Sequence, residues 1–148
     1  MAKMEIRRLT PAIGAEINGL DLSRNLSNSD WEQVHDAFLA HQVLVFRDQN
    51  LSAEAMVSLA SRFGNIGSYP FLNSLPGHPE ITEVIKEADE KINFGGLWHT
   101  DTSYLETPPL GSLLLAKEVP EVGGDTLFAN MYLAYETLSP ALRDWLRG

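Results

Sequence analysis

The chain of 148 residues carries a formal net charge of −9, and its 11 lysines and arginines are scattered along it. This charge argues against nucleic acid or an anionic membrane as a partner, because both require a basic binding surface. The lack of cysteine excludes a disulfide framework and a thiolate metal site, and it fits a cytoplasmic protein.

The hydropathy pattern predicts one globular domain that does not enter a membrane. A hydrophobic content of 44% is ordinary for globular proteins, and the length suits a single domain over residues 1–148. Residues 1–8 interrupt their apolar side chains with charges, so we expect no secretory signal there. No apolar run approaches the roughly 18 residues of a membrane span.

The first part of the chain alternates short extended segments with a helix. Residues 5–9 and 15–20 are extended segments that predict a small hairpin. The run Ser29-Asp30-Trp31-Glu32 has the spacing of a capping box, so we expect a helix over about residues 30–40. Residues 42–47 are rich in β-branched and aromatic side chains, and they predict a largely buried strand.

A second helix is expected after Ser52, which can cap it, and Gly64 is expected as its C-cap. Its apolar side chains recur at helical spacing and predict a core-facing stripe of Met56, Leu59, Ala60 and Phe63. Residues 65–79 contain three prolines and two glycines, so they predict a long loop of the kind that often serves as a lid. Residues 80–86 predict a strand.

Strands are also expected in the last third of the chain. Residues 98–104 read as extended, and residues 111–119 suit a strand covered on both faces. Residues 121–126 form a glycine-rich turn that leads into a strand over residues 126–129.

Two helices are expected at the end of the chain. Asn130 is placed to cap a helix that runs to about Leu138, and Ser139 with Pro140 is typical of the start of another. Strands predominate from residue 80 to residue 129 and helices flank them, so a single α+β domain is the predicted class.

The segment from Trp98 to Tyr104 contains a candidate metal site. In a strand, residues two apart point to the same face, so His99 and Asp101 would present one nitrogen and one oxygen to the same point. Those are two of the three ligands of the 2-His-1-carboxylate triad that binds non-haem Fe(II). Taken alone, the pair is better explained by a surface imidazole and a turn carboxylate.

Further motifs accompany this pair. Trp98-His99-Thr100-Asp101 is followed by Pro108-Pro109 and by Gly123-Gly124-Asp125-Thr126, and it is preceded by Gly14-Ala15-Glu16-Ile17 and Phe63-Gly64. Together these motifs closely resemble the TauD/TfdA-type family, the taurine and aryloxyalkanoate dioxygenases that depend on Fe(II) and 2-oxoglutarate. The resemblance extends over nearly the whole chain.

The resemblance implies a double-stranded β-helix, or jelly roll, with helices packed on one side. It implies His99 and Asp101 as iron ligands and Thr126 as a hydrogen-bond donor to the carboxylate of 2-oxoglutarate. A hydroxyl just past a Gly-Gly turn is also well placed for an anion on physical grounds. The implied reaction uses O₂ to hydroxylate a small organic acid while 2-oxoglutarate is decarboxylated to succinate and CO₂.

The chain departs from the taurine-type members at positions that bind substrate. Those members have a His-Pro-x-Tyr segment and an Asn four residues before the ligand histidine, whereas this chain has Tyr69-Pro70-Phe71-Leu72 and Gly95. We therefore expect a small organic anion other than taurine, and residues 70–74 look more like the aryloxyalkanoate branch. The expected substrate-lining residues are Tyr69, Phe71, Asn73, Gly95 and Tyr104.

No histidine follows Asp101, and the earlier ones, His35, His41 and His78, are expected to be structural. We therefore expect these residues to be the N-terminal part of a longer chain, with the third iron ligand and the arginine for 2-oxoglutarate elsewhere. Such a portion would have an incomplete jelly roll with exposed edges that favour a homo-oligomer or aggregation. Alternatives are a catalytically incompetent fragment, a non-catalytic metal-binding jelly-roll module, or a zinc hydrolase, which would also need a third ligand.

Overall fold

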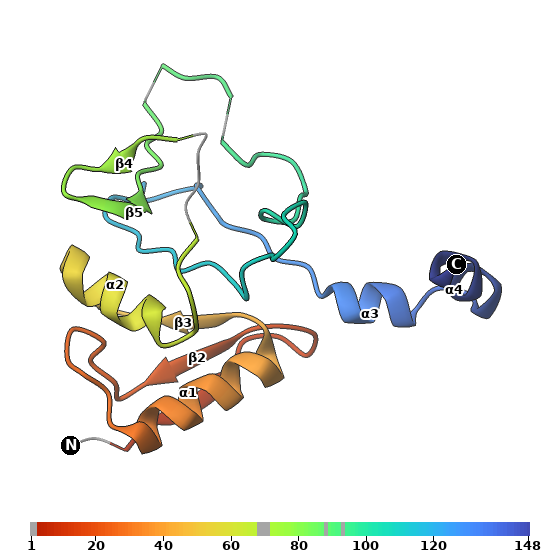
Figure 1. Cartoon of the computed structure of the whole chain (residues 1–148), viewed down its shortest axis with the longest axis horizontal. Coiled ribbons are helices and arrows are strands. Elements are labelled where there is room, and N and C mark those ends of the chain that lie inside the picture. Colours follow the sequence, from red (N-terminus) through yellow and green to blue (C-terminus); the bar gives the residue numbers. More distant parts are fainter. Residues whose placement is uncertain (1–2, 68–71, 88, 93) are drawn as a thin grey trace. The chain divides into compact units, whose positions relative to one another are not determined.

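The computed structural model describes residues 3–67, 72–87, 89–92 and 94–148 (Figure 1). The chain divides into two compact units. Unit 1 contains residues 1–21, 26–49 and 118–148, and unit 2 contains residues 22–25 and 50–117. Helices and small sheets are both present, which confirms the mixed α/β content, whereas the single domain stays a prediction.

Unit 1 contains a three-stranded sheet in the order β1-β2-β3, of which Figure 1 labels β2 and β3. Strand β1 (Glu5–Arg8) pairs antiparallel with β2 (Ala15–Asn18), which confirms the predicted hairpin. Strand β2 pairs parallel with β3 (Leu44–Phe46). Parallel neighbours need a crossover connection, and helix α1 (Asn28–His41) supplies it.

Helix α1 begins slightly earlier than its sequence predicts. Ser27, not Ser29, is the N-cap, and its Oγ accepts a hydrogen bond from the Asp30 amide at 3.1 Å. The Ser27 hydroxyl also donates to Asp30 Oδ2 at 2.7 Å. Asp30 thus stands at the position, three residues after the cap, where a capping box has Glu or Gln. The helix packs its buried Val34 and Ala37 into the core of this unit, and the half-buried rings of Trp31 and His35 lie 6.0 Å apart at a tilt of 45°.

Gln42 separates α1 from β3. Its backbone is left-handed, with φ of 62°, and its N–H donates to the Phe38 carbonyl at 2.7 Å. A left-handed residue cannot continue a strand, so β3 begins at Leu44 and not at the predicted Gln42.

The central strand of this sheet carries a buried carboxylate. The Glu16 residue is only 8% exposed, and its Oε1 accepts from Arg7 Nη2 at 3.1 Å while its Oε2 accepts from Arg47 Nε at 3.2 Å. Arg7, on β1, lies opposite Glu16, and Arg47 directly follows β3. The carboxylate on β2 is therefore hydrogen-bonded to side chains from both neighbouring strands or their ends. The Arg7 guanidinium first, and then that of Arg47, lower the pKa of Glu16 below its ordinary value.

We expect Glu16→Gln to lower the free energy of unfolding at neutral pH, with the difference from wild type shrinking below about pH 4.5. The pKa of Glu16 is lower in the folded state than in the unfolded state. The stabilisation by its ionised carboxylate is therefore present above the unfolded-state pKa and is lost as pH falls through the folded-state pKa. Urea denaturation at pH 7 and pH 3.5 measures it. Glu5→Gln, at an exposed position of β1, is the control. The expectation would be contradicted if Glu16→Gln differed from wild type in unfolding free energy by the same amount at both pH values.

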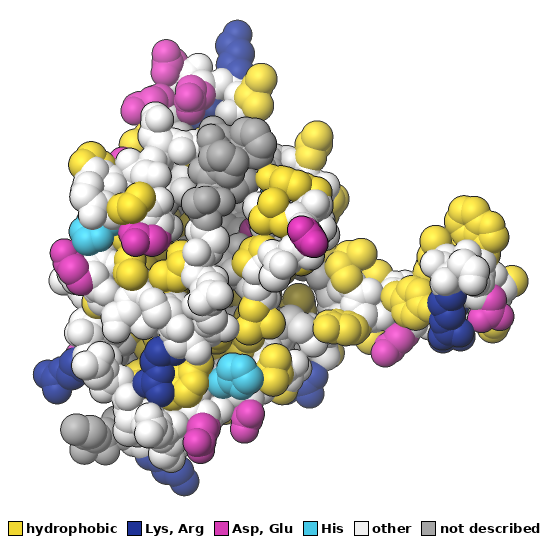
Figure 2. All heavy atoms as spheres, in the orientation of Figure 1, with side chains coloured by type: hydrophobic (Ala, Val, Ile, Leu, Met, Phe, Trp, Pro, Cys, Tyr) yellow, Lys and Arg dark blue, Asp and Glu magenta, His cyan; other side chains and the backbone are white. Residues whose placement is uncertain are grey.

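Unit 1 also contains the two helices at the end of the chain. Asn130 caps α3 (Met131–Glu136), and Ser139 caps α4 (Pro140–Arg147), in which Pro140 is the first residue, so both predicted caps are confirmed. Asn130 Nδ2 also donates to the Ala12 carbonyl at 2.7 Å, next to the β1–β2 hairpin. Neither helix buries a residue, and Figure 2 shows hydrophobic side chains open on the surface of both.

In unit 2, Ser52 caps α2 (Ala53–Ser61) as predicted, and Leu59 is the buried member of its apolar stripe. The helix does not extend to Gly64. The amides of Arg62 and Phe63 each bond to the carbonyl three residues earlier, at 3.1 and 3.0 Å, which tightens and ends the last turn.

A second hairpin follows in this unit. Strand β4 (Ser74–Leu75) pairs antiparallel with β5 (His78–Thr82). The turn between them has Gly77 with φ of 82°, a conformation that glycine adopts without strain. The predicted loop over 65–79 is therefore wrong in its last part, and the strand predicted over 80–86 begins earlier and ends at Thr82.

The remaining predicted strands, over residues 98–104, 111–119 and 126–129, are absent from the described residues. A strand persists only when a neighbour pairs with its backbone N–H and C=O groups, and the described part of the chain offers these segments no such neighbour. High β-propensity alone was not sufficient. Of the helices that the structure describes, none combines the length and apolar character needed to cross a membrane.

Candidate metal centre

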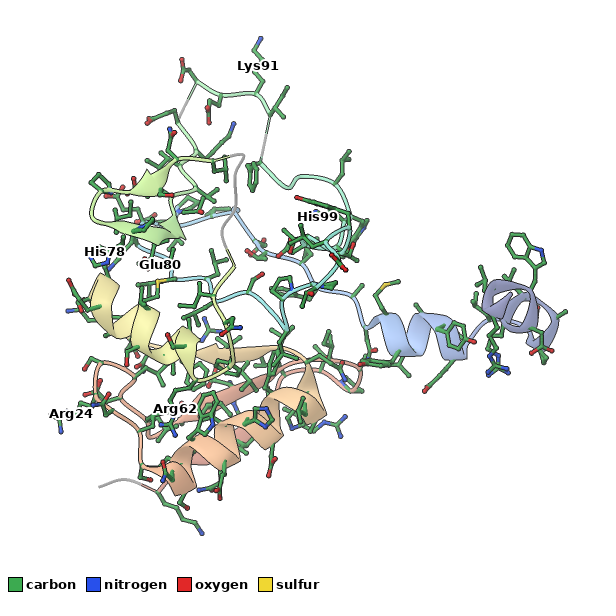
Figure 3. All side chains as sticks on the ribbon, viewed as in Figure 1. Arg24, Arg62, His78, Glu80, Lys91 and His99 are labelled. Atoms are coloured by element: carbon green, nitrogen blue, oxygen red, sulfur yellow. The ribbon has the colours of Figure 1, made fainter. Side chains whose placement is uncertain are left out.

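The imidazole of His99 is held by contacts at both of its nitrogens. Nδ1 lies 2.7 Å from the Leu97 carbonyl oxygen, which can only accept, so Nδ1 is the donor. This hydrogen bond turns Nε2 toward Asp101, whose Oδ1 lies 3.1 Å away. Figure 3 labels His99 on the loop of unit 2 that carries the pair. An imidazole held through Nδ1 in this way presents Nε2 to a metal.

The pair meets without the strand that was predicted. Residues 98–100 are irregular, and the chain then turns, with Thr102 at φ of 46° and the Leu105 amide donating to the Thr102 carbonyl at 3.1 Å. His99 and Asp101 face each other as predicted, but in an irregular segment that leads into this turn and not in a strand.

The surroundings of His99 favour a positive charge on its imidazole. The Leu97 carbonyl raises the pKa of His99 above its ordinary value; desolvation opposes this rise, and the Asp101 carboxylate adds to it. Both side chains remain about half exposed, at 52% for His99 and 60% for Asp101, so a ligand can reach them.

The distance between the two facing atoms fits a shared metal ion. Ligand atoms about 2.1 Å from a metal and at right angles to each other are about 3.0 Å apart. The observed separation of Nε2 and Oδ1 is 3.1 Å. The described residues contain no group of three His, Cys, Asp or Glu side chains that could hold a metal, and the role of His99 and Asp101 as metal ligands stays a prediction.

Sequence reasoning missed one residue of the site, Ser112. Its hydroxyl donates to Asp101 Oδ2 at 2.9 Å, so the two oxygens of this carboxylate have different partners. Eleven residues separate Ser112 from Asp101. No periodicity relates positions at that spacing in an irregular segment, and the sequence therefore gave no signal for this contact.

Gly95 was predicted to line the substrate site, and the structure places it against the imidazole. A Cβ at this position would lie 3.2 Å from His99 Cε1, and the backbone φ is 66°. Both the space and the backbone conformation therefore favour glycine here.

The other predicted substrate residues are less closely associated with the pair. Asn73 is exposed beside β4, and Tyr104 is 66% exposed in the turn after Asp101. No hydrogen bond joins either of them to His99 or Asp101 in the described part of the chain. Tyr69 and Phe71 lie outside the described residues.

Thr126 belongs to unit 1 and is exposed. The turn before it is confirmed, because Gly123 and Gly124 have φ of 84° and 72°. A Cβ on Gly124 would lie 3.1 Å from Pro120 Cγ, so this turn has little room for a side chain. The role of Thr126 as a ligand of 2-oxoglutarate stays a prediction.

A histidine nitrogen and an aspartate oxygen converging from a His-x-Asp motif are characteristic of mononuclear metal enzymes of the 2-His-1-carboxylate type. Residues 5–148 match the model of the family described as "Taurine catabolism dioxygenase TauD, TfdA family". The chain belongs to this family.

Similar proteins support the assignment. An alkylsulfatase of Acinetobacter baylyi is 36% identical over 97% of this chain and 44% of its own length. An alpha-ketoglutarate-dependent sulfonate dioxygenase of Saccharomyces cerevisiae is 31% identical over 99% of this chain and 38% of its own. The crystal structure of a taurine dioxygenase from Burkholderia xenovorans superposes with a TM-score of 0.84 at 35% identity, covering 98% of this chain and 51% of that one. The chain thus spans about half the length of these relatives or less.

Proposed function

We propose that the full-length protein is an Fe(II)- and 2-oxoglutarate-dependent dioxygenase. One oxygen atom of O₂ would enter the substrate as a hydroxyl group, and the other would enter succinate as 2-oxoglutarate loses CO₂. The observation that carries the proposal is the 3.1 Å approach of His99 Nε2 to Asp101 Oδ1 in a chain of the TauD/TfdA family. The cysteine-free composition supports a cytoplasmic location.

In this proposal, His99 Nε2 and Asp101 Oδ1 would hold the iron, and the Leu97 carbonyl keeps the imidazole in the tautomer that binds metal. Bound iron would supply the oxidative chemistry, with 2-oxoglutarate as the source of two electrons. The Thr126 hydroxyl would donate to a carboxylate oxygen of 2-oxoglutarate. We further propose that the full-length protein forms the double-stranded β-helix expected for the family.

The proposed substrate is a small organic anion with a sulfonate, sulfate ester or carboxylate group. The names of the relatives that act on sulfonates or alkyl sulfates support the sulfur-containing classes, and the residues at 70–74 support an aryloxyalkanoate. Tyr69, Phe71, Asn73 and Tyr104 are the proposed lining residues. Taurine is disfavoured because Gly95 has no side-chain amide to offer and lies against His99.

An oxygen electrode tests this proposal with the full-length protein, Fe(II), 2-oxoglutarate and a panel of organic anions. We expect an alkyl sulfate, an alkyl sulfonate or an aryloxyalkanoate to stimulate O₂ consumption and succinate release more than taurine does. Omission of iron or 2-oxoglutarate is the control. If taurine were the best substrate, the reading of Tyr69 and Gly95 would be wrong.

A second candidate is metal binding without turnover by this stretch of chain. It is favoured by the lack of a third metal-ligating side chain beside His99 and Asp101 among the described residues. Comparison of the 148-residue chain with the full-length protein in the same assay separates the two functions. Substrate-coupled turnover by the 148-residue chain alone would exclude this second candidate.

A further inference from the structure

We propose that Ser112 is a positioning residue that keeps Asp101 a single-oxygen ligand of the metal. This inference rests on the proposed function. Ser112 Oγ donates to Asp101 Oδ2 at 2.9 Å, whereas Oδ1 lies 3.1 Å from His99 Nε2. One carboxylate oxygen therefore faces the shared metal position and the other is occupied by a hydroxyl.

The number of oxygens that Asp101 offers to the metal matters for the proposed reaction. In an octahedral site, three protein ligands that each bind through one atom leave three open positions. A chelating 2-oxoglutarate would take two of these and O₂ the third. A carboxylate that bound through both oxygens would occupy one of the open positions. A hydrogen bond that keeps Oδ2 away from the metal would therefore leave that position open for O₂.

Little else holds the Asp101 side chain. It is 60% exposed, and its hydrogen-bonding contacts in the described part of the chain are those to His99 and Ser112. An exposed carboxylate without such contacts would rotate freely, and the entropy of fixing it would oppose metal binding. The Ser112 hydrogen bond lowers that cost before the metal arrives.

The segment that carries Ser112 is itself anchored. Lys117, five positions further along, donates from Nζ to the Leu51 carbonyl at 3.3 Å, and Leu51 is buried just before α2. Both ends of this contact lie in unit 2, as do Asp101 and Ser112. Ser112 therefore links the loop of Asp101 to a segment that is tied to the core of its own unit.

The test measures metal binding as well as turnover. Full-length wild type, Ser112→Ala and Ser112→Thr are titrated anaerobically with Co(II), and the visible d–d spectrum is recorded. We expect Ser112→Ala to weaken Co(II) binding by about 10–100-fold, the usual range for a lost hydrogen bond to a metal ligand, and to alter the spectrum. Ser112→Thr keeps the hydroxyl and should restore both.

Ser61→Ala is the matched control, because Ser61 is an exposed serine of the same unit that donates to the Val57 carbonyl at 2.8 Å within α2. It should bind Co(II) as wild type does. Wild-type affinity and spectrum in Ser112→Ala would overturn the role of Ser112 alone. If wild type bound no Co(II), or Asp101→Ala bound it equally well, the proposed function would fail and this inference with it.

Discussion

Replacing His99 by alanine in the full-length protein is expected to reduce 2-oxoglutarate-dependent O₂ consumption to the level seen without iron. The imidazole supplies the nitrogen that faces Asp101 Oδ1 at 3.1 Å, and a methyl group cannot ligate a metal. Asp101→Asn should have the same outcome, because a neutral amide is a much poorer ligand for a hard cation than a carboxylate.

Anaerobic titration separates loss of binding from loss of chemistry. Fe(II) with 2-oxoglutarate should give wild type a weak visible charge-transfer band, and both variants should lack it. His78→Ala is the control, since His78 lies on β5 with its Nε2 3.4 Å from Glu54 and outside the proposed site (Figure 3). Full turnover by His99→Ala would show that His99 is not a ligand of the iron.

Gly95→Ala is expected to weaken metal binding by about 10-fold or more, in the range found for changes beside a metal ligand. The added Cβ would lie 3.2 Å from His99 Cε1, so the ring must move by a few tenths of an ångström to avoid it. A metal site tolerates little displacement of a ligand. The measurement is the Co(II) dissociation constant of the full-length protein.

Gly77→Ala is a closely matched control for this change. Gly77 has φ of 82° and Gly95 has φ of 66°, so alanine is strained at both positions, by roughly 1–2 kcal/mol. A Cβ on Gly77, however, would meet no atom within 4 Å. Both variants should lose thermal stability, and only Gly95→Ala should lose affinity. Equal affinities in the two variants would show that the contact with His99 has no role.

The features that could be predicted from the sequence are those encoded within a few residues. Asn130, Ser139 and Ser52 cap helices where expected, because an N-cap depends only on its own side chain and the amide three positions later. The β1–β2 hairpin was predictable because its two strands are also close together in the sequence. The first cap was misplaced because Ser27 and Ser29 both precede a turn with acidic residues, and the structure uses Ser27.

The features that could not be predicted depend on residues distant in sequence. The segment at 98–104 has strand-like composition, yet a strand also needs a partner that composition does not identify. The His-x-Asp motif was still found, because its chemistry is local to three residues. Ser112 was not, because its contact with Asp101 follows from the path of an irregular chain and from no repeating pattern.

The three-stranded sheet has a consequence for the order in which the protein folds during translation. Its strands and the crossover helix α1 all lie within residues 5–46, so every partner they need leaves the ribosome before residues 118–148 do. The Asn130 hydrogen bond to Ala12 instead spans 118 residues and forms only after the later segment has emerged. Synthesis therefore favours a nascent sheet, held together by the ion pairs of Glu16, to which residues 118–148 are added later.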